Sequence, residues 1–158
     1  MVKIRIKLGT VFDDPEFFEV KMNCTKCGKC CFNTQMELLP EDIERIIRLG
    51  YGLSDFAVFD GEVWRLRNVD GHCVFLNPHT MECTIYENRP IGCRIYPLVY
   101  DDAEGPYIDK ECPAWNTVDR NEIKKTWEIL TTIYNEIKTN KSMGKIEIRY
   151  LFLLILLS

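Results

Sequence analysis

The 158-residue sequence lacks the motifs that mark the common enzyme classes. It has no P-loop, no GxGxxG dinucleotide fingerprint and no HExxH metalloprotease motif. None of its three serines lies in a nucleophile elbow, so the sequence does not predict a serine hydrolase. Whether the protein is an enzyme is therefore left open at this point.

An excess of positive charge is also missing. The 20 Lys and Arg residues are outnumbered by 24 Asp and Glu residues, which gives a formal net charge of -4. Because proteins that bind nucleic acids concentrate positive charge on their surface, we expect no nucleic-acid partner. A protein partner is compatible with the sequence, which does not identify it.

Long apolar runs are absent too. The run from Leu151 to Leu157 is only seven residues long, whereas a membrane-spanning helix needs about 20 apolar residues. We expect residues 146–158 to form an apolar C-terminal tail or strand rather than a membrane anchor. Residues 1–145 are expected to form a single cysteine-cluster metal-binding domain.

The N-terminal residues do not form the unbroken apolar stretch of a secretory signal. Residues 2–8 instead alternate apolar and basic side chains with a period of two, which predicts a strand with one exposed face. We therefore expect the protein to be cytoplasmic, where disulfides are rare and cysteines are more often metal ligands.

Cysteine, by contrast, is abundant, with eight residues. Four of them lie within residues 24–31, too close together to join distant loops but well spaced to converge on one ion or cluster. The other four are spread over residues 73–112 and must reach the first group through tertiary folding. The predicted metal ligands are Cys24, Cys27, Cys30, Cys31, Cys73, Cys83, Cys93 and Cys112.

Eight thiols make two sets of four, the number that closes a structural zinc site or a [4Fe-4S] cluster. Whether the eight thiols form one metal site or two is left open. The vicinal Cys30 and Cys31 are, however, difficult to direct at the same site. The tight CxxCxxC run with the remote Cys112-Pro113 is similar to bacterial ferredoxin ligation, so we favour an iron-sulfur cluster over zinc. At a zinc site, His72 or His79 could replace a thiol.

Thiolate charge calls for positive neighbours and for amide donors. Arg89 and Arg94 lie close to Cys93 along the chain, and we predict that they contact the cofactor. Gly28 follows Cys27 directly and is expected to adopt a positive φ that turns backbone amides toward sulfur.

Two helices are predicted by capping signals and apolar periodicity. Pro40 to Leu49 begins with proline and acidic residues and ends before Gly50, and Asp119 to about Thr139 begins with a capping-box pattern. The apolar stripes are Ile43, Ile46 and Ile47 in the first helix, and Ile123, Trp127, Leu130, Tyr134 and Ile137 in the second.

Short strands are predicted at Val63–Leu66 and Cys73–Leu76, paired around a turn at residues 68–71 so that a small hairpin carries Cys73. A last short strand is predicted at Pro106–Asp109. The expected fold is α+β, a small irregular metal-stapled domain with short antiparallel strands and a long C-terminal helix.

The cysteine pattern resembles a known family over about residues 20–115. CxxCxxCC at residues 24–31 is followed by GHCVFL at 71–76, by CTIYENRPIGCRIYP at 83–97 and by Cys112. This arrangement is similar to the CxxCxxCC cysteine-cluster family, described as a zinc- or iron-chelating domain. The resemblance implies that the eight cysteines are the family's cysteines. It also implies iron-sulfur or zinc-finger-like character, and a flagellin lysine N-methylase belongs to the same group.

Three functional hypotheses follow. The first is a module that carries an iron-sulfur cluster for redox or partner-enzyme support. The second is a structural zinc domain for protein interaction, and the third is a metal-dependent enzyme of methyltransferase type. This chain is shorter than a methylase with its own substrate-binding region is expected to be.

Overall fold

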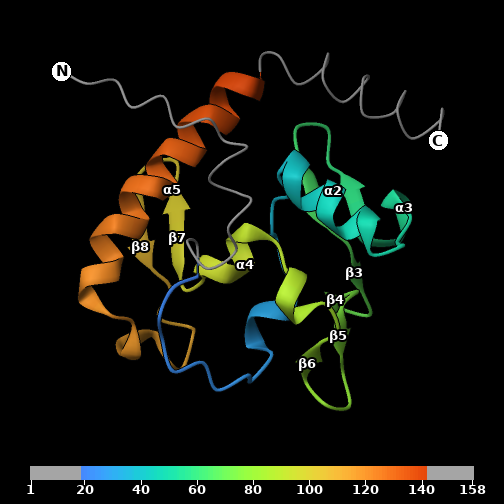
Figure 1. The fold of residues 1–158 in the computed structure, drawn as a ribbon, viewed down its shortest axis with the longest axis horizontal. Helices are drawn as coiled ribbons and strands as arrows, with labels where there is room; N and C mark the ends of the chain where they lie inside the picture. Colours follow the sequence, from blue (N-terminus) through green and yellow to red (C-terminus); the bar gives the residue numbers. More distant parts are fainter. Residues whose placement is uncertain (1–18, 142–158) are drawn as a thin grey trace.

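The computed structural model describes residues 19–141, so the predicted strand at residues 2–8 and the tail at 146–158 lie outside the described residues. Within them the fold is α+β, with short two-stranded antiparallel sheets and a long C-terminal helix (Figure 1). The predicted fold class is therefore confirmed.

The elements are short, apart from two of the helices. The 3-10 turns are η2 (Lys29–Cys31), η3 (Tyr86–Asn88) and η4 (Trp115–Thr117), and the helices are α2 (Pro40–Arg48), α3 (Leu53–Phe56), α4 (Ile91–Ile95) and α5 (Arg120–Lys141). The strands are β1 (Ala57–Phe59), β2 (Trp64–Leu66), β3 (Asn68–Val69), β4 (His72–Cys73), β5 (Leu76–Asn77), β6 (Glu82–Cys83), β7 (Leu98–Asp101) and β8 (Gly105–Ile108). Each strand pairs with its neighbour in the chain, as β1-β2, β3-β4, β5-β6 and β7-β8.

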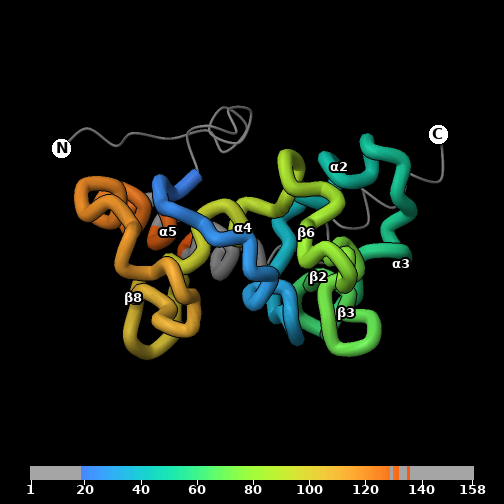
Figure 2. The backbone as a smooth tube through the Cα atoms, turned by 90° about the horizontal axis from the view of Figure 1, so that it is seen from below, coloured from blue at the N-terminus to red at the C-terminus, as the bar shows by residue number. Residues whose placement is uncertain are grey.

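The buried apolar residues form two clusters. The α2 cluster consists of Leu38, Ile43, Ile46, Phe56, Ala57, Leu66, Cys73, Phe75, Leu76 and Ile85, and the α5 cluster of Val20, Leu39, Ile91, Ile95, Leu98, Val118 and Leu130. Figure 2 shows α5 and β8 at one end and α3 and β3 at the other, with the blue segment that carries the first four cysteines between them. The cysteines near the N-terminal end of the described chain thus lie between two small cores.

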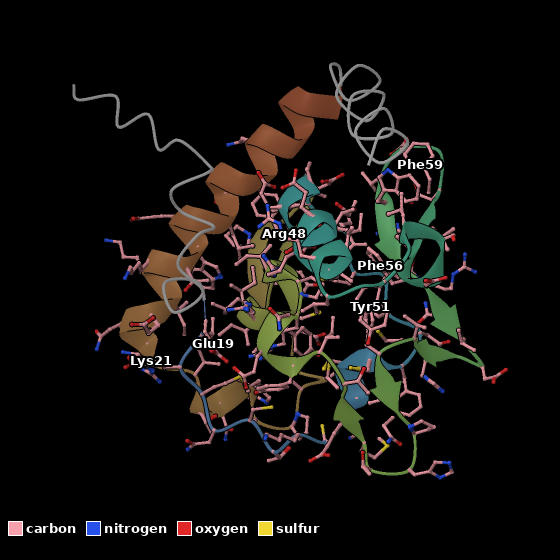
Figure 3. All side chains as sticks on the ribbon, turned by 45° about the vertical axis from the view of Figure 1, so that its right-hand side comes forward. Glu19, Lys21, Arg48, Tyr51, Phe56 and Phe59 are labelled. Carbon is pink, nitrogen blue, oxygen red and sulfur yellow. The ribbon has the colours of Figure 1, made fainter. Side chains whose placement is uncertain are left out.

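Aromatic packing fills the α2 cluster. Tyr51 and Phe56, both labelled in Figure 3, place their ring centroids 5.1 and 6.0 Å from that of Phe75. Phe56 is fully buried, whereas Tyr51 closes the cluster from the exposed side. Because Phe75 lies two residues after Cys73, this packing fixes the backbone next to a predicted metal ligand.

The predicted hairpin turn at residues 68–71 exists, but the prediction that Val63–Leu66 pairs across it with the strand of Cys73 was wrong. Asp70 and Gly71 both have positive φ, the conformation of a tight two-residue hairpin turn, so the strands joined are β3 and β4. Because this short turn pairs residues 68–69 with residues 72–73, residues 64–66 are not part of the hairpin. The strand β2 pairs with β1 instead. Cys73 is still carried by the hairpin, opposite Asn68. The predicted strand near residues 106–109 is confirmed as β8.

The long helix α5 begins where its cap was predicted. The Asp119 carboxylate accepts a hydrogen bond of 2.8 Å from the Asn121 amide, and Leu130 is buried in the α5 cluster with Ile123 and Trp127 packed against it. The side chains of Tyr134 and Ile137 lie outside what the structure describes. No helix within residues 19–141 has both the length and the apolar character needed to cross a membrane.

A buried carboxylate that the sequence did not single out connects α2 to α4. Asp42 is 1% exposed, and its carboxylate accepts hydrogen bonds from the Leu39 amide at 3.2 Å and the Ile91 amide at 3.0 Å. It also pairs with Arg45, although burial still raises the pKa of Asp42. Because Ile91 begins the helix that contains Cys93, Asp42 fixes the position of that cysteine.

Replacing Asp42 with alanine is predicted to destabilise the fold by about 3 kcal/mol, because two buried amides and Arg45 lose their shared acceptor. The midpoint of urea unfolding measures this change. The matched control is Glu44→Ala on the exposed face of the same helix, which is expected to shift stability by no more than about 0.5 kcal/mol. Equal effects of the two substitutions would contradict a tethering role for Asp42.

Candidate metal centre

The fold gathers all eight cysteines around one cavity. Each is a free thiol, and together they line a cavity of about 1040 Å³ whose walls include residues of both apolar clusters. Thiols that are spread from residue 24 to residue 112 in the sequence therefore line the same cavity. That they bind metal is still a prediction from the sequence.

The backbone that carries the first four cysteines turns at Gly28, which has the positive φ that the sequence predicted. Gly28 has φ +72, and a Cβ placed on it would lie 2.9 Å from Met81 Cε in the loop between β5 and β6. The Gly28 carbonyl accepts a hydrogen bond of 2.9 Å from the Cys31 amide. The close contact at Gly28 thus brings the first cysteine group against the hairpin that carries Cys83.

Backbone amides donate to sulfur in a repeated local arrangement. The Lys26 amide donates to Cys24 Sγ at 3.4 Å, two residues back along the chain. The same relation recurs three times, with donation from Phe75 to Cys73, from Ile85 to Cys83 and from Ala114 to Cys112. An amide that donates to sulfur stabilises the thiolate form, which is the form that binds metal. The sequence predicted such amides only around Gly28.

Four of the thiols have pKa values that are raised mainly by burial. Burial raises the pKa of Cys73 to about 11 and the pKa of Cys93 well above that of an ordinary thiol. The pKa values of Cys83 and Cys112 are raised for the same reason. Such thiols stay protonated unless a cation takes the place of their protons.

Cys30 and Cys31 form a coupled pair with sulfur atoms 4.0 Å apart. The hydrogen bond between the two thiols lowers the pKa of Cys30 to about 7 and raises the pKa of Cys31. The two neighbouring residues therefore differ in how readily they ionise.

The two predicted cationic residues both line the cavity but have different surroundings. Arg89 lies over the Tyr86 ring at 3.8 Å and pairs with Glu19, labelled in Figure 3. Its charge contributes to the lowered pKa of Cys30 and opposes the rise in the pKa of Cys83 that burial causes. Arg94 is 7% exposed and donates to the carbonyl oxygens of Glu87 and Arg89. Arg89 therefore acts electrostatically on the thiols, whereas the hydrogen bonds of Arg94 to Glu87 and Arg89 hold the backbone of residues 87–89. Cofactor contact by either residue is still a prediction.

The histidines lie elsewhere in the described part of the chain. Neither His72 nor His79 lines the cavity, and His72 Nδ1 lies 2.9 Å from the Cys73 carbonyl oxygen. Within residues 19–141 no three Cys, His, Asp or Glu side chains are placed closely enough to hold a metal ion as they stand. The chemistry of the donor set, which is eight free thiols on one cavity, fits zinc and iron-sulfur clusters, since both are held by thiolates.

Gly28→Ala is predicted to reduce stability by about 1–2 kcal/mol through the left-handed backbone and, in addition, to lower the metal content. Gly50→Ala is the matched control, because Gly50 also has positive φ but has no neighbouring atom within 4 Å of the added Cβ. Thermal unfolding and metal analysis of the two purified variants test this. Equal metal loss in both variants would show that strain alone, and not the contact with Met81, accounts for the effect.

Comparison with known proteins places the cysteine pattern in a described family. The CxxCxxCC family model, whose description reads "Putative zinc- or iron-chelating domain", matches residues 23–125, more than half of the chain. The uncharacterized protein MJ0661 of Methanocaldococcus jannaschii is 33% identical over 93 residues, an alignment that covers 51% of this chain and 49% of that protein. The chain thus spans about half the length of this curated relative, and no solved structure matches it. Because the family model matches more than half of the chain, the chain belongs to the CxxCxxCC family.

Proposed function

We propose that the protein is a metal-binding module that carries an iron-sulfur cluster on cysteine thiolates and serves redox chemistry or the support of a partner enzyme. One observation carries this proposal: eight free thiols from distant parts of the sequence line a single cavity between two apolar clusters. Free thiols also suit a reducing compartment, so the proposal includes a cytoplasmic location.

Electrostatics supports a bound cation. Several thiols have raised pKa values, as for Cys93, whose pKa is raised by burial and by the charges of Cys30, Cys73 and Cys83. A metal centre supplies the positive charge that lets such thiols ionise, and the amides at four of the cysteines supply hydrogen bonds to the resulting thiolates.

Packing supports a structural contribution from the same centre. Isolated two-stranded sheets are marginal in water, and every sheet within residues 19–141 is of that kind. Ligands drawn from both ends of the molecule would tie the α2 and α5 clusters together, so metal binding and folding would be coupled.

The choice of iron-sulfur over zinc rests on the donor set. The cavity offers eight thiols, and neither of the chain's two histidines lies on its wall. A cluster held by thiolates would supply one-electron chemistry, and the apolar residues on the wall would limit its contact with water. A structural zinc site with four thiolates is the alternative, since zinc accepts the same donors.

A third candidate, a metal-dependent enzyme of methyltransferase type, is favoured by the size of the cavity. At about 1040 Å³ it reaches the upper end of the roughly 300–1,000 Å³ usual for small-molecule sites. Asp101 and Asp102 also line it, so there is room and polarity for a substrate beside the thiols. This candidate requires that the purified protein bind S-adenosylmethionine in an equilibrium assay.

Anaerobic purification followed by metal and acid-labile sulfide analysis tests the proposal. We expect iron and sulfide in equal amounts, with a broad visible absorbance that dithionite bleaches. Zinc without sulfide would replace the iron-sulfur proposal with the structural zinc alternative. Protein that holds neither metal under these conditions would contradict a metal-binding function altogether.

Arg89→Gln is predicted to make metal loss to a chelator about tenfold faster, because the substitution removes the positive charge near Cys30 and Cys83. Decay of the metal-dependent absorbance measures this rate. The control is Arg48→Gln, since Arg48 is an exposed residue of α2, labelled in Figure 3, whose ion pair with Glu44 lies at 3.5 Å. Identical rates of metal loss for the two variants would show that Arg89 does not stabilise the metal centre.

A further inference from the structure

Residues 24–30, which carry three of the eight cysteines, are anchored on either side but are loosely held in between. The Asn23 amide donates to Thr117 Oγ1 at 3.0 Å, and the Asn33 amide donates to the Gly71 carbonyl oxygen at 2.8 Å. Within the described part of the chain, no hydrogen bond joins residues 24–30 to any residue outside the CxxCxxCC motif and the phenylalanine that follows it. We call residues 24–30 the cysteine strap.

Side chains from the β5-β6 hairpin and from the turn after it meet the cysteine strap. Met81 lies against Gly28, as described above. Lys26 Nζ lies over the Tyr86 ring, 5.1 Å from the ring centroid. Lys26 has φ 51, a conformation that residues with a side chain seldom adopt, and its amide donates to Cys24 Sγ at 3.4 Å. The residue that shapes the turn of the strap is thus also the one that contacts Tyr86.

Tyr86, by contrast, belongs to a backbone segment that is firmly held. Each of the four carbonyl oxygens of residues 86–89 accepts a hydrogen bond from an arginine side chain. The donors are Arg45, Arg89 and Arg94. Because Arg45 lies in α2 and Arg94 in α4, charged donors from two helices fix the backbone that carries the Tyr86 ring.

A second cation shares the same ring. Arg89 Cζ lies 3.8 Å from the Tyr86 centroid, and the Arg89 guanidinium also donates to the Tyr86 carbonyl oxygen at 2.8 Å. The faces of an aromatic ring carry partial negative charge, so the ring attracts a cation without neutralising it. Lys26, Tyr86 and Arg89 all line the cavity, so the ring holds two positive charges on the wall that carries the thiols.

We propose that Tyr86 is a positioning residue for the metal centre, because its ring holds Lys26 and thereby keeps the cysteine strap in place on the cavity wall. This inference rests on the proposed metal-binding function and goes beyond it by naming a residue that is not a ligand. The contact between Lys26 and Tyr86 does not require metal, so it can be tested on metal-free protein. Cys73 is the reporter, since it is 4% exposed and lines the cavity that the strap helps to enclose.

The first test compares Lys26→Met with Lys29→Met in the metal-free, full-length protein. Both lysines are exposed residues of the strap that line the cavity, but within the described chain only Lys26 lies over an aromatic ring. Alkylation of Cys73 by iodoacetamide, followed by mass spectrometry, is expected to be about threefold faster in Lys26→Met and unchanged in Lys29→Met. A rate for Lys26→Met no higher than that for Lys29→Met would overturn the proposal.

The second test changes the ring itself. Tyr86→Phe keeps the ring and is expected to react at the wild-type rate, whereas Tyr86→Leu removes the ring and is expected to alkylate at Cys73 about tenfold faster. Tyr86→Leu is also expected to lose metal to a chelator faster than Tyr86→Phe. Equal alkylation rates in these two variants would overturn the role of the ring.

The two tests remain informative if one variant or the proposed function fails. Lys26 and Lys29 are exposed, so the lysine pair decides the question even where Tyr86→Leu does not fold. Wild-type protein that binds no metal would reject the proposed function, whereas the alkylation rates of metal-free protein report on the strap alone.

Discussion

The structure depends on one electrostatic constraint, which is that sulfur atoms brought together away from water cannot all be ionised without compensating charge. Burial and mutual proximity raise the pKa values of Cys73, Cys83, Cys93 and Cys112. Amide donors and the Arg89 guanidinium act in the opposite direction, although burial still outweighs them at Cys83. The metal centre that we propose would satisfy this constraint and would explain why the thiols line one cavity.

The rest of the fold positions those thiols. The α2 cluster holds Cys73 and supports its neighbours, and the tight β5-β6 hairpin places Cys83 opposite Leu76. Asp42 connects α2 to the start of α4, which contains Cys93. Since the sheets are small and the two clusters are modest, a centre with ligands from both ends of the molecule would contribute to stability as well as to function.

Much of this architecture was predictable from local patterns in the sequence. The helices at Pro40 and Asp119 follow from capping signals and apolar spacing, and the positive φ of Gly28 follows from its place after Cys27. Strand pairing was harder, because the Asp70-Gly71 turn fixes only its immediate neighbours and leaves the partner of β2 to tertiary packing. The role of Asp42 was not predictable, since an acidic residue in a first helical turn is usually exposed. The adjacency of Cys30 and Cys31 did indicate that they are difficult to direct at one site, but it could not show which of them packs against the α2 cluster.

We propose that thiolates, and not oxygen or nitrogen donors, hold a metal in this cavity. X-ray absorption spectroscopy at the edge of the metal that copurifies with the wild-type protein tests this most directly. We expect a first shell of about four sulfur atoms at about 2.3 Å, the distance typical of metal-thiolate bonds. A first shell of oxygen or nitrogen at about 2.0–2.1 Å would contradict it.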